Sequence, residues 1–168
     1  NPYEVPYYNP GPDASEIGYM LQRRKELGGF VPERRNSPRP ITLPDAKAYS
    51  GAARGSGKQM AATTMAFVRI LTTLLRDKTI GKHVVPIVPD ESRTFGMEGL
   101  FRQFGIFSQV GQLYQPEDAK QLMYYKEDKS GQILEEGINE AGAMASWIAA
   151  ATSYSISNVP MIPFFVYY

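Results

Sequence analysis

The chain has 168 residues, of which 43 % are hydrophobic and 21 % are charged, an ordinary composition for a folded globular domain. Lys and Arg number 18 against 17 Asp and Glu, so the net charge of +1 provides no strong attraction to nucleic acid or to an anionic membrane. The sequence has no cysteine, which excludes disulfides, thiolate zinc sites and a cysteine nucleophile. Its one histidine, His83, argues against a histidine-rich metal site or a Ser-His-Asp triad.

Residues 1–57 predict an extended linker that contains one helix. Prolines that alternate with tyrosines favour an extended chain at the start, because proline fixes φ and lacks a backbone donor. Asp13 followed by Glu16 is typical of a capping box and predicts a helix that continues through Lys25 and ends at Gly28. A second Pro-, Ser- and Gly-rich stretch then predicts an irregular connection.

Residues 58–168 alternate between helical and strand-like patterns. Apolar side chains at helical spacing predict a helix over 58–78, and β-branched residues over 83–88 are typical of a buried parallel strand. A helix over 137–151 is apolar on nearly every side, which favours an interior or an interface. Residues 161–168 predict a second parallel strand. The segment between the first strand and that helix predicts an aromatic, glycine-spaced helical turn followed by a loop (94–114), a short helix (116–125) and a charged loop (126–131). The fold class is therefore α/β, a parallel sheet flanked by helices.

Asp90 and Glu91 directly follow the first predicted strand, at the edge where open α/β sheets bind ligands. One interpretation is that they orient a ligand or relay protons there. The other is structural: Asp90 caps a following helix, and Glu91 pairs with Arg93 on the surface. The residues by themselves leave both interpretations open.

Glu140 lies near the start of the apolar helix, between Ile138 and Ala141. Burying an ionised carboxylate among such neighbours costs several kcal/mol unless a donor or a cation compensates it, so one interpretation is a functional group in a dry pocket. The other interpretation places it at the helix N-terminus, where the dipole and free amides stabilise a carboxylate. Both remain open from the residues.

Five blocks of the sequence carry a resemblance. They are DESRTFGMEGLFRQ (90–103), YYKED (124–128), GQILEEGINE (131–140), AAATSYS (149–155) and MIPF (161–164). With these blocks, the chain resembles the homodimeric bacterial pyruvate dehydrogenase E1 component. The resemblance implies that residues 1–57 form an interdomain linker. It implies that 58–168 form the incomplete N-terminal part of a pyrimidine-binding domain, within a transketolase-like thiamine diphosphate-binding fold. Since the chain opens on Asn1 and stops in a strand-like apolar run, we expect it to be a piece of a longer protein.

The resemblance also implies an activity. The family uses thiamine diphosphate to decarboxylate pyruvate and to acetylate reductively the lipoyl group of the E2 dihydrolipoyl acetyltransferase. It implies a cytoplasmic homodimer with the cofactor between two subunits, and no nucleic-acid or membrane partner. The Mg²⁺ ligands are expected from a domain outside this chain, because the family's Gly-Asp-Gly motif does not occur in it. The alternatives are another transketolase-like thiamine diphosphate enzyme, or a fragment that is an inert scaffold when alone.

The resemblance assigns roles to five residues. Glu140 matches the glutamate that hydrogen-bonds N1′ of the aminopyrimidine and favours the tautomer that removes the C2 proton of the thiazolium. Ile138 would line the pocket wall, and Asp90 and Glu91 match acidic residues near the reacting carbon. Tyr168 matches a tyrosine that faces the substrate channel. The expected catalytic residues are therefore Glu140, Glu91 and Tyr168, and the expected cofactor-binding residues are Glu140, Ile138 and Asp90, with no metal ligand in the chain.

Overall fold

The computed structural model describes residues 3–30, 34, 39–90, 92–117 and 124–167, which fall into two units, Asn1–Arg34 and Arg35–Tyr168. The first unit contains helix α1 (Ser15–Glu26), which confirms the helix predicted there. The capping box is wrong, however, because the N-cap residue is Ala14 and no side chain caps the helix. The predicted glycine ending is confirmed, since the Gly28 amide donates to a carbonyl of the last turn.

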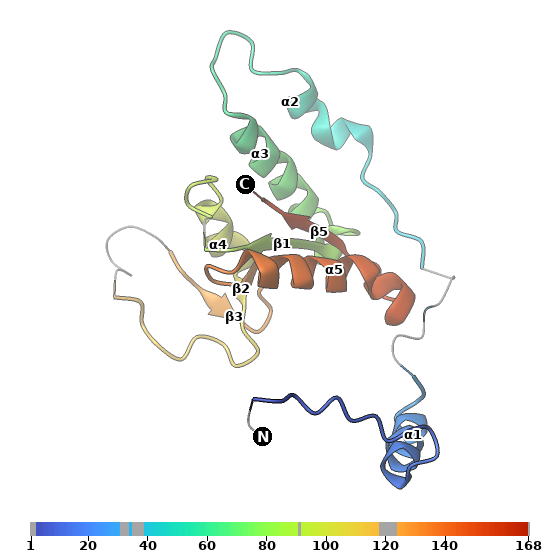
Figure 1. The fold of residues 1–168 in the computed structure, drawn as a ribbon. Helices are drawn as coiled ribbons and strands as arrows, with labels where there is room; N and C mark the ends of the chain where they lie inside the picture. Colours follow the sequence, from blue (N-terminus) through green and yellow to red (C-terminus); the bar gives the residue numbers. More distant parts are fainter. Residues whose placement is uncertain (1–2, 31–33, 35–38, 91, 118–123, 168) are drawn as a thin grey trace. The chain divides into compact units, whose positions relative to one another are not determined.

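The second unit is built on a three-stranded parallel sheet with the order β4-β1-β5 (Figure 1). The strands are β1 (Val84–Val88), β4 (Leu134–Glu135) and β5 (Ile162–Phe165). The parallel pairing of β1 with β5 confirms the two strands predicted from sequence. Strand β4 was not predicted. It has two residues, and its register places Glu135 opposite Val88, at the carboxyl end of β1.

Two long helices cover the sheet, α3 (Thr63–Arg76) and α5 (Glu140–Ile156), and they lie on opposite sides of it (Figure 1). Both helices were predicted from sequence, but each begins and ends at other residues than the predicted ranges 58–78 and 137–151. Helix α3 begins at Thr63 rather than at residue 58, because the preceding residues are exposed and have nothing to pack against. The α/β fold class, a parallel sheet flanked by helices, is confirmed.

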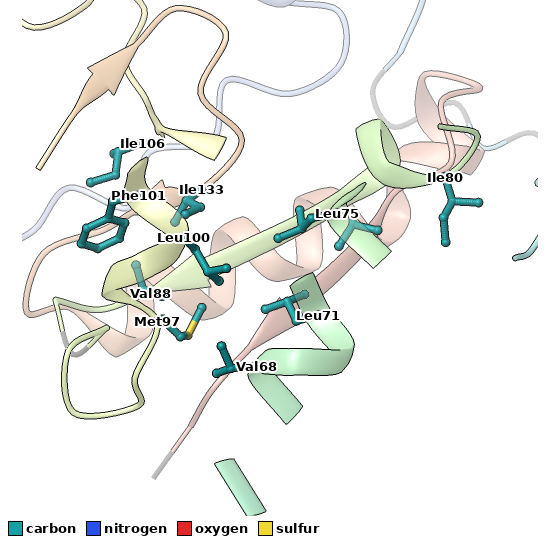
Figure 2. Close-up of a cluster of buried hydrophobic side chains, with 11 residues drawn as sticks. Val68, Leu71, Leu75, Ile80, Val88, Met97, Leu100, Phe101, Ile106 and Ile133 are labelled. Atoms are coloured by element: carbon teal, nitrogen blue, oxygen red, sulfur yellow. The ribbon is translucent and has the colours of Figure 1, made fainter. Parts of the chain in front are cut away.

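The hydrophobic core lies between α3 and the sheet. Val68, Leu71 and Leu75 are the buried residues of α3, at the predicted helical spacing. Figure 2 shows these side chains beside residues from β1 and α4 (Glu98–Phe104). The rest of the core cluster comprises Ile80, Val84, Val88, Met97, Leu100, Phe101, Ile106 and Ile133. Because side chains alternate along a strand, Val84 and Val88 face this core and the buried Ile87 faces α5.

The remaining elements are short. They are η1 (Ala46–Tyr49), α2 (Ser50–Ala53), η2 (Gly81–His83) and the parallel pair β2 (Ile106–Phe107) and β3 (Glu127–Asp128). The charged loop predicted over 126–131 therefore contains a strand. Most of the helix predicted over 116–125 lies outside the described residues, and its described ends are not helical. His83 is structural, since its Nδ1 lies 2.7 Å from the carbonyl oxygen of Pro160.

Replacing Leu71 by alanine tests the packing of α3 on the sheet. Leu71 is 0 % exposed, so Leu71→Ala should lower the free energy of unfolding by about 2–5 kcal/mol through lost burial and a cavity. Chemical denaturation measures this change. Met60→Ala is the matched control, because Met60 is fully exposed and its truncation should change stability by less than about 0.5 kcal/mol. Equal effects of the two substitutions would contradict the packing described.

Candidate functional site

The residues assigned from sequence gather where the parallel strands end. Since β4, β1 and β5 run in the same direction, the segments that follow them leave the sheet at one edge. Asp90 follows β1, and Ile138 and Glu140 follow β4. Three of the five residues that the sequence singled out thus lie on segments that leave two neighbouring strands at this edge, where open α/β sheets bind ligands.

Glu135, the last residue of β4, links two turns at this edge. Its Oε1 accepts the backbone N–H of Asp90 at 2.7 Å, and the backbone amide of Gly137 also acts to lower the pKa of this carboxyl. Asp90 has a φ of 60°, a left-handed conformation that costs a non-glycine residue roughly 1–2 kcal/mol. The hydrogen bond to Glu135 therefore helps to hold a strained residue in place.

Burial raises the pKa of Glu135 to about 7. The charges of Asp90 and Glu136 also raise this pKa, whereas the backbone amides of Asp90 and Gly137 act to lower it. Glu135 was not predicted from the sequence. Its position after Ile133 and Leu134, directly before the turn into α5, was the available signal.

The neighbouring Glu136 ties α5 to the sheet. Its backbone N–H donates to the carbonyl of Val88 at 2.9 Å, and its Oε1 accepts the hydroxyl of Ser146 at 2.5 Å. Ser146 lies in the middle of α5, so the sheet fixes where this helix begins and how it is rotated. The side chains of Glu135 and Glu136 therefore have different partners. Glu135 binds the turn that follows β1, and Glu136 binds helix α5.

Glu140 is the first residue of α5 and is exposed. The helix is capped by Asn139, whose side chain accepts the Gly142 N–H at 2.9 Å, and the Glu140 carboxylate has no partner among the described residues. Of the two interpretations that the sequence left open for Glu140, burial by the described residues of this chain is not seen. The physical reason is that its apolar neighbours, such as Ala141, are exposed themselves. The helix-terminus position is the interpretation that the structure supports.

Helix α5 presents an exposed apolar face. Ile138, just before the helix, is 86 % exposed, and the apolar residues exposed along α5 are Ala141, Met144, Ala145, Trp147, Ile148 and Ala149. Exposed apolar patches of this kind mark surfaces that bind another molecule or chain segment. Of the two places predicted for this helix, an interior or an interface, the exposed face is typical of an interface.

The other sequence assignments have different outcomes. Glu91 and Tyr168 lie outside the described residues. The alternative that Asp90 caps a helix is wrong for the helices described, because α4 begins at Glu98 with Met97 at its N-cap. Ser92, beside this turn, is 4 % exposed, and its hydroxyl has no partner among the described residues.

Two other features of the described residues bear on ligand binding. Among the described residues, no group of three or more His, Cys, Asp or Glu side chains is arranged to hold a metal ion. A groove of about 540 Å³ lies between the η1–α2 segment and α3, lined by Tyr49, Ala52, Ala66 and other residues. It contains none of the residues assigned from sequence. The sheet edge, where strand ends and a strained turn converge, remains the candidate site.

Residues 40–168 match the family described as the pyruvate dehydrogenase E1 component middle domain. The chain belongs to this family. The middle domain has the transketolase-like thiamine diphosphate-binding fold that the sequence resemblance implied.

Curated relatives named pyruvate dehydrogenase E1 component agree with the family match. The Cupriavidus necator protein is 60 % identical over 98 % of this chain, and the Pseudomonas aeruginosa protein is 56 % identical over 98 %. The Mycobacterium tuberculosis protein is 55 % identical over the whole chain. This chain spans 18–19 % of the length of these relatives. Separately, none of the helices described is both long and apolar enough to cross a membrane.

The raised pKa of Glu135 predicts a pH dependence of stability. Between its ordinary pKa near 4.5 and the folded value of about 7, the folded state holds more protons than the unfolded state, so this group makes stability fall as pH rises through that range. Glu135→Gln should remove this contribution and flatten the profile. Thermal unfolding followed by circular dichroism between pH 4.5 and pH 7.5 measures it, with Ile138→Ala as an uncharged control that keeps the parental slope. Identical slopes for Glu135→Gln and the parent would contradict the assignment.

Proposed function

We propose that this chain is part of a thiamine diphosphate-dependent pyruvate dehydrogenase E1 component. In this proposal, residues 1–57 form a linker with one helix and 58–168 form the N-terminal part of the pyrimidine-binding domain. The whole protein decarboxylates pyruvate and reductively acetylates the lipoyl group of an E2 dihydrolipoyl acetyltransferase. Its curated relatives carry the name of this enzyme, and their identity extends over nearly the whole chain. This long match favours the E1 component over other transketolase-like enzymes.

The structural observation that carries the proposal is the lone carboxylate of Glu140. It has no partner among the described residues, and it stands at the start of an apolar helix face beside the exposed Ile138. A carboxylate suits a heterocyclic nitrogen that gains a proton, and an apolar side chain suits the face of the ring. These residues therefore fit the aminopyrimidine end of thiamine diphosphate.

When bound, thiamine diphosphate supplies a nucleophilic carbon and an electron sink for the loss of CO₂ from pyruvate. The role of Glu140 is to accept a hydrogen bond from N1′ and to hold the proton there. This bond strengthens when water is excluded, because the local dielectric constant falls. The apolar face of α5 can exclude water once another surface covers it. Asp90, with Glu91 and Tyr168, is proposed to lie near the reacting carbon and the substrate channel.

The partners follow from the same proposal. A second E1 subunit, with the remaining segments of the polypeptide, covers the apolar face of α5 and supplies the diphosphate end of the cofactor site with its Mg²⁺ ligands. E2 and pyruvate complete the set, and no nucleic acid or membrane is involved. The proposed location is the cytoplasm. The near-neutral charge of the chain supports the absence of a polyanionic partner.

The role of Glu140 can be tested in the whole protein with Glu140→Gln. Glutamine keeps the shape of the side chain and cannot hold the proton, so C2-proton exchange of bound thiamine diphosphate should slow by roughly 10²-fold or more. Exchange into deuterium oxide, stopped with acid and read by proton NMR, measures this rate, and pyruvate decarboxylation should fall with it.

Glu16→Gln is the matched control for that experiment. Glu16 also lies exposed in the first turn of a helix, α1, so its replacement removes the same charge from a comparable position. It should leave both rates unchanged. If Glu140→Gln exchanged the C2 proton at the parental rate with the cofactor bound, the proposed role of Glu140 would be wrong.

A further inference from the structure

Two turns carry the described residues assigned to cofactor binding, and they come from different strands. The turn after β1 carries Asp90, and the turn after β4 leads through Ile138 to Glu140. The two strands are neighbours in the sheet, with Val88 opposite Glu135. The backbone pairing of β1 with β4 ends before these residues. The distance between them therefore depends on how the two turns are held relative to one another.

Glu135 joins both turns through one carboxylate. It accepts the backbone N–H of Asp90 at 2.7 Å, and the backbone amide of Gly137 also favours its charged form. Both partners have left-handed backbones, with φ of 60° for Asp90 and 68° for Gly137. Glycine adopts this conformation without strain, whereas Asp90 needs surroundings that hold it, and the Glu135 carboxylate is a specific contact that does so. The side chain of Glu135, at the end of β4, therefore reaches across to the turn that follows β1.

The surroundings of Glu135 disfavour the charged form of its carboxylate. The group is partly buried, and two further acidic side chains, Asp90 and Glu136, lie near enough to repel its charge. A glutamine in its place would avoid the charge, but its neutral oxygen would accept a weaker hydrogen bond from the Asp90 amide. A carboxylate at this place is therefore explained by the stronger hydrogen bond that it makes across to the turn after β1.

We propose that Glu135 is a positioning residue that sets the distance between Asp90 and the Ile138–Glu140 turn. It acts through backbone hydrogen bonds and does not touch the cofactor. The inference rests on the proposed function, because it assigns Glu135 to the same site. Displacing one turn relative to the other moves Glu140 and Asp90 apart, and small displacements of reacting groups cost large factors in rate.

The test uses the whole protein with Glu135→Gln and Glu135→Asp. Aspartate keeps the charge but is one methylene shorter, so it cannot reach the Asp90 amide while both turns keep their places. In both variants, hydrogen–deuterium exchange followed by mass spectrometry should show the peptide that contains Asp90 exchanging about 10- to 100-fold faster. C2-proton exchange of bound thiamine diphosphate should slow at least about 10-fold. The dissociation constant for the cofactor should change less than about threefold, because the diphosphate end supplies most of the binding.

Glu136→Gln is the matched control. It removes the same charge from the adjacent residue, and the glutamine oxygen can still accept the Ser146 hydroxyl, so it should keep the parental rate of C2-proton exchange and the parental protection of Asp90. Parental protection and exchange in Glu135→Asp would show that only charge is needed and would overturn the inference, even if Glu135→Gln failed to fold. Loss of activity with Glu140→Gln and full activity in both Glu135 variants would overturn this inference alone. Parental exchange with Glu140→Gln would instead overturn the proposed function.

Discussion

The parallel pairing of β1 with β4 is the constraint on which the candidate site depends. It consists of a two-residue register, Ile87 with Leu134 and Val88 with Glu135, yet it fixes where two turns and one long helix begin. The Glu136 amide continues the ladder to Val88, and its side chain holds Ser146 of α5. A one-residue slip would turn Glu135 to the opposite face of the sheet and would release Asp90. Short as it is, this contact sets the geometry of the whole edge.

The hydrophobic core makes so short a strand possible. Ile133, directly before β4, is fully buried in the cluster that α3 and α4 complete, and Ile106 forms a bridge with it. Gly131 permits the close approach, because a Cβ at that position would lie 2.2 Å from the carbonyl oxygen of Ile106. Packing around Ile133 therefore supplies the stability that the two-residue strand β4 lacks. The turns that carry the candidate residues are thus attached to a well-packed core.

Sequence patterns predicted the elements whose signal is local. Helix α3 has apolar residues at helical spacing over several turns, and β1 and β5 are β-branched or aromatic runs of ordinary length. Strand β4 and the left-handed backbone of Asp90 have no such signal, since each exists only because of a neighbour distant in the chain. The same holds for Glu135, whose role depends on an amide that is 45 residues away. The resemblance supplied candidate residues, and the fold shows which of those described lie at one edge.

Two glutamates at this edge have opposite environments. Glu140, for which the sequence left burial and a helix terminus open, is exposed at a helix terminus, and Glu135 is partly buried and has a raised pKa. This contrast fits two different roles, one for each carboxylate. A carboxylate that holds backbone amides is complete within one chain, because its donors are local. A carboxylate that must hold a ring nitrogen cannot be buried by its own helix, since the ring has to reach it. An apolar environment for the Glu140 carboxylate must then be completed by another surface. The exposed apolar face of α5 provides one side of that contact.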